Sequence, residues 1–321
     1  MNTLIGQDLE TAAQFLKEGA LVAIPTETVY GLAANAFNVE AVAKIFEAKN
    51  RPSFDPLIVH THSIEEVEKF TLNFPEKAKK LAEKFWPGSL TILLPKNQLI
   101  PDLVTAGLNT VAVRIPNHPL TIELLKNLEF PLAAPSANPF GYISPTTALH
   151  VEAQLEGKVG YIIDGGYCRV GIESTIIEIK DNKTIIYRLG GISVETIKNE
   201  IGEIEEIRHS SSNPKASGML ASHYAPSKPI VLGNIDTMLE NHDAQKTGIL
   251  AFRTPQQSIP ENHQVVLSKS GDFAEAAQHL FAGMRYLDGL DIDVILTELL
   301  PEEGLGRAIN DRLRRASTTK L

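Results

Sequence analysis

Short apolar runs alternate with helical segments along most of this chain, and that alternation limits the possible folds more than any other feature. Before residue 202, apolar runs with the length of buried strands occur at 21–24, 57–59, 90–94, 111–115, 132–134 and 161–164. Between two of them, Asn38 can cap a helix that ends before Pro52, and Ser63 with Glu66 matches a capping box for the next helix. Alternation of this kind predicts an α/β fold.

The alternation begins again near the C-terminus, after a stretch without any period. The runs 176–179 and 185–188 flank Asp181-Asn182-Lys183, a hairpin signal, so the first domain should mix parallel and antiparallel strands. The runs 230–232, 248–252, 265–267 and 294–296 predict a small open parallel sheet with helices on both faces. We therefore expect an N-terminal domain with a twisted mixed sheet over 1–201, a linker or lid over 202–228, and a smaller Rossmann-like parallel-sheet domain over 229–321.

Further helix starts can be predicted from local signals. Ser144-Pro145 is expected to begin a helix, because proline is tolerated in the first turn, and Asp272 with Glu275 should cap an amphipathic helix in the C-terminal domain. Gly304 and Gly306 open the last helix, where close packing explains the glycines better than a nucleotide fingerprint does. This helix also carries arginines that are more typical of a solvated face than of a nucleic-acid patch: Arg307, Arg312, Arg314 and Arg315.

Composition excludes several classes of protein. An apolar fraction of 43% over 321 residues is enough for buried cores, and no stretch approaches the roughly 18 apolar residues of a membrane span. The polar N-terminus lacks the regions of a signal peptide, so we expect a cytoplasmic location. The net charge of −9 argues against a protein whose main task is binding a nucleic-acid backbone. The single cysteine, Cys168, excludes a disulfide framework and a cysteine-based zinc cage.

Two short polar runs give the strongest functional signal. Lys49-Asn-Arg51-Pro52 places a lysine and an arginine two residues apart at a helix end, and Ser136-Ala-Asn138 follows later in the chain. Pro52 stiffens the first run, and the hydroxyl and amide of the second can bind oxyanions. Together the runs predict an anion clamp, which indicates phosphate chemistry. Taken alone, Lys49 and Arg51 could equally take part in surface salt bridges with acidic side chains at a helix end.

Four longer motifs that include these runs occur in one order: Pro25-Thr-Glu-Thr-Val-Tyr-Gly-Leu32, Lys49-Asn-Arg51-Pro-Ser-Phe-Asp-Pro-Leu57, Ala134-Pro-Ser136-Ala-Asn138 and Glu173-Ser-Thr175. Together they resemble the YrdC/Sua5 family of threonylcarbamoyl-AMP synthases. The longer Sua5 form adds a C-terminal domain, and the resemblance extends over essentially the whole chain. It implies a YrdC-like catalytic domain and a nucleotidyltransferase that joins L-threonine, bicarbonate or CO2, and ATP into threonylcarbamoyl-AMP and pyrophosphate.

The resemblance also implies where each substrate binds. Lys49 and Arg51 would be catalytic, because they would screen the charge of the triphosphate. The pocket for L-threonine would be formed by Thr28, His60, Arg114, Ala134 and Ser174. The contacts to ATP would come from Arg51, Asp55, Thr110, Ser136, Asn138, Ser144, Arg188 and, in the linker, Tyr224. The family often has asparagine where this chain has Asp55, and a carboxylate cannot donate an amide hydrogen bond. Mg2+ would assist by bridging phosphate oxygens, and no metal site of the protein's own is expected.

The product implied by the resemblance is an activated threonylcarbamoyl group for adenosine 37 of certain tRNAs (the t6A modification). Its transfer would need downstream partner proteins, and direct binding of tRNA by this chain is expected to be weak or absent. The run Ser217 to Pro226 resembles a family motif ending in His-Tyr-Ala-Pro and is expected to close over ATP as a lid. No residue assigns a role to the C-terminal domain.

Two other functions remain open from the sequence. One is an RNA-binding module, because the YrdC fold has a concave surface suited to duplex RNA, although the acidic balance disfavours such binding. The other is a carbamoyl-transfer enzyme of hydrogenase maturation, but the zinc-finger module of such proteins needs more than one cysteine. A zinc site at His60 and His62 lacks a third ligand, and a serine hydrolase would need a G-x-S-x-G elbow.

Overall fold

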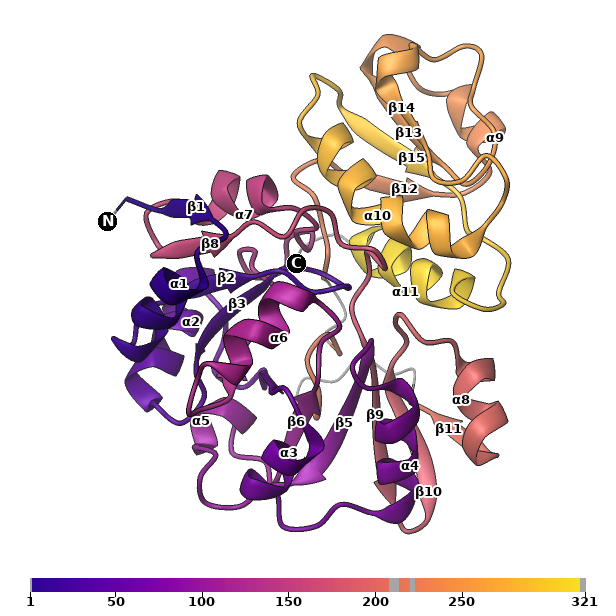
Figure 1. The fold of residues 1–321 in the computed structure, drawn as a ribbon. Coiled ribbons are helices and arrows are strands. Elements are labelled where there is room, and N and C mark those ends of the chain that lie inside the picture. Colours follow the sequence, from indigo (N-terminus) through magenta and orange to yellow (C-terminus); the bar gives the residue numbers. More distant parts are fainter. Residues whose placement is uncertain (1, 208–213, 220–222, 318–321) are drawn as a thin grey trace. The chain divides into compact units, whose positions relative to one another are not determined.

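The computed structural model describes residues 2–207, 214–219 and 223–317, and these divide into two compact units (Figure 1). The N-terminal unit comprises Met1–Phe140, Pro145–Arg169 and Glu173–Leu220, and the C-terminal unit comprises Gly141–Ser144, Val170–Ile172 and Ala221–Leu321. One unit contains a mixed sheet and the other a parallel sheet, which confirms the predicted fold class. No helix in the described part of the chain combines the length and the apolarity that crossing a membrane requires.

The N-terminal unit is built on one sheet of eleven strands with parallel and antiparallel neighbours. In chain order they are β1 (Leu4–Gly6), β2 (Val22–Ile24), β3 (Gly31–Asn35), β4 (Ile58–His60), β5 (Leu90–Pro95), β6 (Thr110–Arg114), β7 (Leu132–Ala133), β8 (Tyr161–Ile163), β9 (Thr175–Lys180), β10 (Lys183–Arg188) and β11 (Ile204–Glu206). Their order in space is β1-β8-β2-β3-β7-β4-β6-β5-β9-β10-β11. Strands far apart in sequence are therefore neighbours, and β4 lies between β7 and β6.

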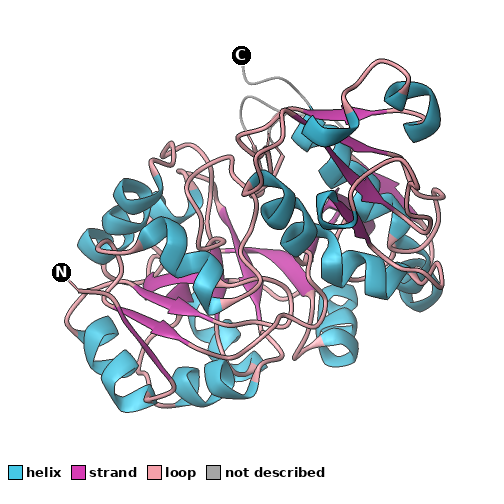
Figure 2. Ribbon diagram, turned by 90° about the horizontal axis from the view of Figure 1, so that it is seen from above, coloured by secondary structure: helices cyan, strands magenta, loops and turns pink. Residues whose placement is uncertain are grey.

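Helices cover both faces of this sheet (Figure 2). They are α1 (Leu9–Lys17), α2 (Val39–Lys49), α3 (Ile64–Phe70), α4 (Glu76–Phe85), α5 (Asp102–Thr105), α6 (Pro119–Lys126), α7 (Ala148–Leu155) and α8 (Val194–Ile201). Strand β2 shows how the two layers form, since alternate residues of a strand face opposite sides. Val22 and Ile24 pack in a cluster with Leu16 of α1 and Leu124 of α6, whereas Ala23 packs in the cluster that contains the apolar face of α2.

Local signals placed several of these elements correctly. The side chain of Asn38 caps the start of α2, and that of Ser63 caps the start of α3. Helix α2 ends at Lys49, where Asn50 adopts the left-handed conformation, so Pro52 lies outside the helix. Asp181 and Asn182 both have positive φ and form the two-residue turn between β9 and β10.

One predicted helix start is wrong, and three strands, β1, β3 and β11, were not predicted. The helix expected from Ser144-Pro145 begins instead at Ala148, with Thr147 as its N-cap. The carbonyl of Pro145 accepts the N–H of Tyr30 at 2.9 Å, and this bond ties Pro145 to the segment between β2 and β3. Within the region 202–228, which shows no period, β11 pairs in parallel with β10.

The C-terminal unit contains a four-stranded parallel sheet in the order β12-β15-β13-β14, as predicted. The strands are β12 (Ile230–Leu232), β13 (Thr247–Ala251), β14 (Gln264–Val266) and β15 (Val294–Thr297), and the helices are α9 (Ile235–Leu239), α10 (Phe273–Asp288) and α11 (Gly306–Ser317). In β13, Ile249 packs in a cluster with Ile235 of α9, while Leu250 lies against Gly283 of α10. Helices α9 and α10 therefore cover opposite faces of this sheet.

The last helix, α11, confirms one expectation and corrects another. A Cβ at Gly306 would lie 2.3 Å from the carbonyl oxygen of Pro301, so packing explains this glycine. Arg312, however, is not on a solvated face, because it is 0% exposed. Its Nη1 lies 3.3 Å from Asp311, and its guanidinium lies 5.5 Å from the ring centroid of Tyr224. The acid and the aromatic ring together make this burial possible.

Gly190→Ala is expected to destabilise the protein by about 1–3 kcal/mol, the usual cost of overpacking. An added Cβ would lie 2.3 Å from the carbonyl oxygen of Glu173 and 2.5 Å from the nitrogen of Thr175, which are both backbone atoms. Urea unfolding measures the change. Gly289→Ala is the matched control, because its nearest neighbour is 3.4 Å away and its φ is −80°. Equal losses in the two variants would contradict the packing explanation.

Candidate functional site

Four of the five residues expected to bind L-threonine are linked through neighbouring strands and one loop. Arg114 ends β6 and lies opposite His60 in the parallel pair of β4 and β6. Arg114 Nη1 donates to Thr28 Oγ1 at 2.7 Å, and the N–H of Ala134 donates to the carbonyl of Ile58 on β4 at 2.9 Å. All four side chains are buried. The chain therefore places a cationic group, a hydroxyl and an imidazole in one region of the sheet.

The loop that carries Thr28 is buried and is held by its own hydroxyl groups. Thr26 Oγ1 accepts the N–H groups of Thr28 and Val29 at 3.1 and 3.2 Å, and it donates to the carbonyl of Val29 at 2.6 Å. Because that bond uses the only hydrogen of the Thr26 hydroxyl, Thr28 must donate in the 2.8 Å contact between the two side chains. Thr28 then offers its oxygen to Arg114, and this fixes the direction of both groups.

Glu27 belongs to this group, although it was not among the predicted site residues. Its Oε1 lies 2.7 Å from Arg114 Nη2 and accepts from Ser89 Oγ at 3.1 Å, and its Oε2 accepts the N–H of Asn117 at 2.9 Å. Burial alone would raise the pKa of Glu27, but the charge and hydrogen bonds of Arg114 outweigh it and lower the pKa. A buried arginine requires a partner of opposite charge, and that requirement was the available signal.

His60 is a neutral member of the group. Its Nδ1 lies 3.2 Å from the carbonyl oxygen of Ile58. Burial, reinforced by the positive charge of Arg114, lowers the pKa of His60 to about 3. A neutral imidazole can donate from one nitrogen and accept at the other, but it adds no charge to the site.

Arg51, Asp55 and Arg188, which are expected to contact ATP, form a second buried cluster together with Lys49. We call these four residues the cation cluster. Arg51 Nη2 lies 2.9 Å from Asp55 Oδ2. Burial raises the pKa of Asp55 against the opposing charges of Arg51, Lys49 and Arg188. A surface salt bridge does not describe this site, because Arg51 is 6% exposed and Lys49 only 1%. The cluster brings the basic side chains of Lys49, Arg51 and Arg188 together around the carboxylate of Asp55.

Lys49 connects the two runs of the predicted clamp. Its Nζ donates to the carbonyl oxygen of Ser136 at 2.5 Å and also to that of Asn138. Burial, with the nearby charge of Arg51, lowers the pKa of Lys49 well below its usual value. The side chain therefore holds the loop 136–138 by its backbone, and direct contact between Lys49 and a substrate stays a prediction.

Ser174 joins the two clusters. Its hydroxyl, from the predicted threonine set, accepts from Arg188 Nη2 at 3.0 Å, and its carbonyl accepts from Arg188 Nε at 2.9 Å. The same hydroxyl lies 2.7 Å from Thr91 Oγ1 on β5. One residue further on, the N–H of Thr175 donates to the carbonyl of Ser89, whose side chain contacts Glu27. The groups predicted for the two substrates are therefore directly connected within the N-terminal unit.

The remaining predicted residues lie elsewhere. Thr110 begins β6, at the opposite end of that strand from Arg114. Ser144 and Tyr224 belong to the C-terminal unit. There, the carbonyl of Ser144 accepts from Arg285 Nε at 3.3 Å, and the ring of Tyr224 stacks on Phe281 with centroids 5.4 Å apart. Their contacts with ATP stay predictions.

One linker residue reaches the cation cluster, although it too was not predicted as a site residue. Ser217 Oγ accepts from Arg51 Nη2 at 3.2 Å, and the carbonyl of Ser217 accepts from Arg188 Nη1 at 3.3 Å. Gly218 follows with a φ of +83°, which favours glycine. Residues 220–222 of the predicted lid 217–226 lie outside the described residues.

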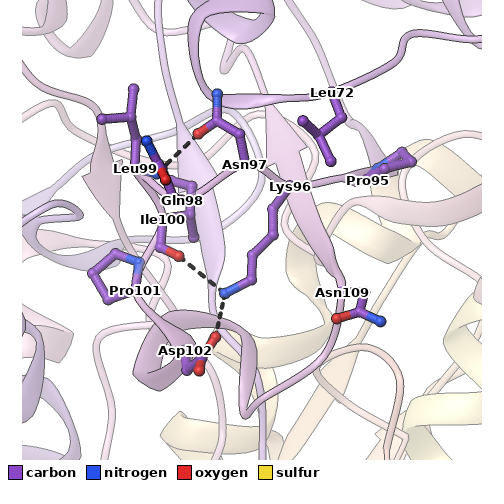
Figure 3. Close-up of a pocket in the computed structure, with 10 residues that line it drawn as sticks. All are labelled: Leu72, Pro95, Lys96, Asn97, Gln98, Leu99, Ile100, Pro101, Asp102 and Asn109. Atoms are coloured by element: carbon purple, nitrogen blue, oxygen red, sulfur yellow. Dashed lines mark hydrogen bonds and ion pairs between the residues drawn. The ribbon is translucent and has the colours of Figure 1, made fainter.

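A separate cavity of about 1050 Å³ opens on the N-terminal unit (Figure 3). It is lined by residues 95–102 together with Leu72 and Asn109. Lys96 Nζ donates to the carbonyl of Ile100 at 2.9 Å and contacts Asp102 at 2.6 Å, so the one cation in its lining is already paired. The lining contains none of the predicted site residues, and we do not assign the substrates to it.

Lys49→Met is expected to destabilise the protein by about 2 kcal/mol, because two buried carbonyl groups lose their donor while the apolar stem is replaced. Thermal and urea unfolding measure this loss. Lys44→Met on the same helix is the matched control, since Lys44 is exposed and its Nζ donates only to the carbonyl of Gly19. That variant should change stability by less than about 0.5 kcal/mol. A wild-type unfolding curve for Lys49→Met would show that the loop 136–138 does not depend on this lysine.

Two family matches together extend over nearly the whole chain. Residues 14–190 match the family Sua5_yciO_yrdC, described as "Telomere recombination". Residues 192–318 match Sua5_C, described as "Threonylcarbamoyl-AMP synthase, C-terminal domain".

Full-length relatives agree with these matches. The threonylcarbamoyl-AMP synthase of Pyrococcus abyssi is 41% identical, and the match covers 98% of this chain and 95% of the relative. The Bacillus subtilis enzyme of the same name is 39% identical, with 95% and 92% covered. A crystal structure of P. abyssi Sua5 complexed with L-threonine has a TM-score of 0.91 at 39% identity, and covers 99% of this chain and 98% of that chain. On these grounds the chain belongs to the Sua5/YciO/YrdC family, in its longer form with a Sua5 C-terminal domain.

Proposed function

We propose that this chain is a threonylcarbamoyl-AMP synthase that condenses L-threonine, bicarbonate or CO2, and ATP, and releases pyrophosphate. The observation that carries the proposal is the hydrogen bond between Ser174 and Arg188, which joins the predicted amino-acid pocket to the cation cluster. A reaction between an amino acid and a nucleotide needs two such sites in direct contact. The names of the full-length relatives and the L-threonine complex of P. abyssi Sua5 support the assignment.

L-Threonine would bind through its carboxylate at Arg114. Arg114 uses Nε toward the carbonyl of Gly88, one N–H of Nη1 toward Thr28, and Nη2 toward Glu27. Each terminal nitrogen of a guanidinium carries two hydrogens, so both keep one N–H for a substrate oxygen. The Ser174 hydroxyl would bind the threonine side chain, and a site built around such a hydrogen bond discriminates against analogues that lack the hydroxyl.

The reaction begins when the neutral amine of threonine attacks CO2. A nitrogen–carbon bond forms, the nitrogen loses a proton, and a carbamate results. A carbamate oxygen then attacks the α-phosphorus of ATP, and the bond from that phosphorus to the pyrophosphate oxygen breaks. Since both reactants are anions, the protein's contribution is to screen charge and to align the groups.

Lys49, Arg51 and Arg188 would supply the screening on the nucleotide side. All three act on the carboxylate of Asp55, so they are close enough together to attract a triphosphate jointly. In the described ranges, no three His, Cys, Asp or Glu side chains gather as a metal site. Mg2+ would therefore enter as part of the nucleotide substrate, with phosphate oxygens among its ligands.

Because the adenylyl group of ATP would be transferred to the carbamate, the enzyme would be a nucleotidyltransferase. Partner proteins would then transfer the threonylcarbamoyl group from the product to adenosine 37 of tRNA. An RNA-binding module would need a cationic surface. The buried positions of Lys49, Arg51 and Arg188 instead suit a small anionic ligand.

Pyrophosphate release from MgATP should require threonine and bicarbonate together, and should fall about 100-fold or more in Arg51→Ala, because one donor to the reacting phosphates is lost. Omitting each substrate in turn, with a coupled pyrophosphate assay, tests both requirements. Arg253→Ala is the control, since Arg253 is exposed in the C-terminal unit. Release that ignores threonine, or no release at all, would favour the RNA-binding alternative.

The run Ser217 to Pro226 would act as a lid, and the contacts of Ser217 with Arg51 and Arg188 support this role. Ser217 uses donors that the triphosphate would need, so Ser217 must give up these contacts when ATP binds and the lid closes over it. Ser217→Ala removes one acceptor, and the KM for ATP should fall about threefold or more, which corresponds to one weak hydrogen bond. The KM for threonine serves as the internal control and should stay the same. An unchanged KM for ATP would contradict gating by Ser217.

A further inference from the structure

Asp55 is the acidic member of the cation cluster, and its surroundings suit an uncharged acid better than an anion. We propose that Asp55 binds the nucleotide as a neutral carboxylic acid: its carboxylate takes up one proton from water as ATP enters, and then donates that hydrogen to an oxygen of the nucleotide. The proposal rests on the function proposed above, because it takes the cation cluster as the site of the triphosphate.

The carboxylate of Asp55 is buried without hydrogen bonds. Asp55 is 0% exposed, and in the part of the chain that the structure describes neither of its side-chain oxygens accepts a hydrogen bond. Its Oδ2 lies 2.9 Å from Nη2 of Arg51. The two hydrogens of that nitrogen are used by the carbonyl of Pro56 at 3.0 Å and by Ser217 Oγ at 3.2 Å. Arg51 therefore stabilises the carboxylate by its charge and not by a hydrogen bond.

Two further basic groups act on Asp55 in the same way. Lys49 ends α2 and Arg188 ends β10, and their hydrogen bonds run to carbonyl and hydroxyl oxygens of other residues. Burial raises the pKa of Asp55 against the opposing charges of Arg51, Lys49 and Arg188. The carboxylate keeps its charge only with the help of these basic groups, so a ligand that draws on them favours the neutral acid.

A triphosphate is such a ligand. Its oxygens would take hydrogen bonds and charge from Arg51 and the other basic groups of the cation cluster. It would also bring several negative charges next to a buried carboxylate, and a like charge within a few ångströms favours the protonated form. Proton uptake by Asp55 removes this repulsion, because two anions then no longer face each other in a weakly screened site.

Protonation also changes what the Asp55 side chain can offer. An ionised carboxylate only accepts hydrogen bonds, whereas the acid has one O–H to donate. The phosphates of the nucleotide present acceptor oxygens, so the acid complements them and the carboxylate does not. When the nucleotide leaves, the proton returns to water and Asp55 pairs again with Arg51.

Nucleotide binding and proton uptake are then linked. The ATP complex holds one proton more than the free protein, so a rise in pH must weaken binding. The affinity for ATP should fall as the pH rises above the pKa of Asp55 in the free protein, with a limiting slope of about tenfold per pH unit for one proton.

The test is calorimetric titration with MgATP, in the absence of threonine, between about pH 6.5 and about pH 8.5. We expect the wild-type chain to bind MgATP at least about tenfold more weakly at the upper pH. Asp55→Asn keeps the shape and supplies a permanent donor, so its affinity should change by less than about threefold over the same range. Asp181→Asn, an exposed change in the turn between β9 and β10, is the matched control and should keep the wild-type profile.

Parallel pH profiles in the wild type and in Asp55→Asn would overturn the proposal. The linked proton would then belong to another group such as Lys49, whose pKa is also lowered by burial. A purely structural role of Asp55 would give the same result, with weaker binding by one factor at every pH. A pH-independent affinity of the wild-type chain would overturn the proposal even if Asp55→Asn fails to fold. If the wild-type chain bound no MgATP at any pH, the proposed function would fail, and the proposal on Asp55 would fail with it.

Discussion

Burying a charged side chain costs roughly several kcal/mol unless partners in the protein replace the lost water. The N-terminal unit buries Lys49, Arg51, Arg114 and Arg188, and each is held by specific acceptors. Carbonyl oxygens hold Lys49, a carboxylate holds Arg114, and Arg51 contacts both Asp55 and Ser217. Apart from Asp55, which is four residues from Arg51, these partners are far away in sequence, so burial of the cations depends on the assembly of distant segments.

The sheet order explains how such partners come together. Arg114 is at the end of β6, Glu27 is in the loop between β2 and β3, and Ser174 immediately precedes β9. Strands β4 and β7 lie between β6 and β3, while β5 separates β6 from β9. Loops that end at one region of this sheet can therefore contribute polar side chains to a common site, although more than a hundred residues separate Glu27 from Ser174.

The sequence predicted what is encoded locally. The α/β class, the capped starts of α2 and α3, the turn at Asp181 and Asn182, and the parallel C-terminal sheet all depend on periods or on residues a few positions apart. It did not predict that Lys49 would bind backbone carbonyls, because those carbonyls belong to residues 136 and 138. The prediction that Arg312 lies on a solvated face was wrong for the same reason. Tyr224, whose ring lies against the Arg312 guanidinium, is remote in sequence.

The resemblance to a family supplied candidate residues but not the relations among them. It named Arg114 for one substrate and Arg51 for the other, without a reason why two arginines in one domain should prefer different anions. The structure shows that each arginine has a carboxylate against it, Glu27 at Arg114 and Asp55 at Arg51, and that Lys49 and Arg188 also act on Asp55. Under the proposed function, selectivity between a carboxylate and a polyphosphate would depend on the charged groups around each arginine rather than on the arginine itself. Since arginine remains protonated throughout the physiological range, its acidic neighbours are the groups through which a protein can set the charge of such a site.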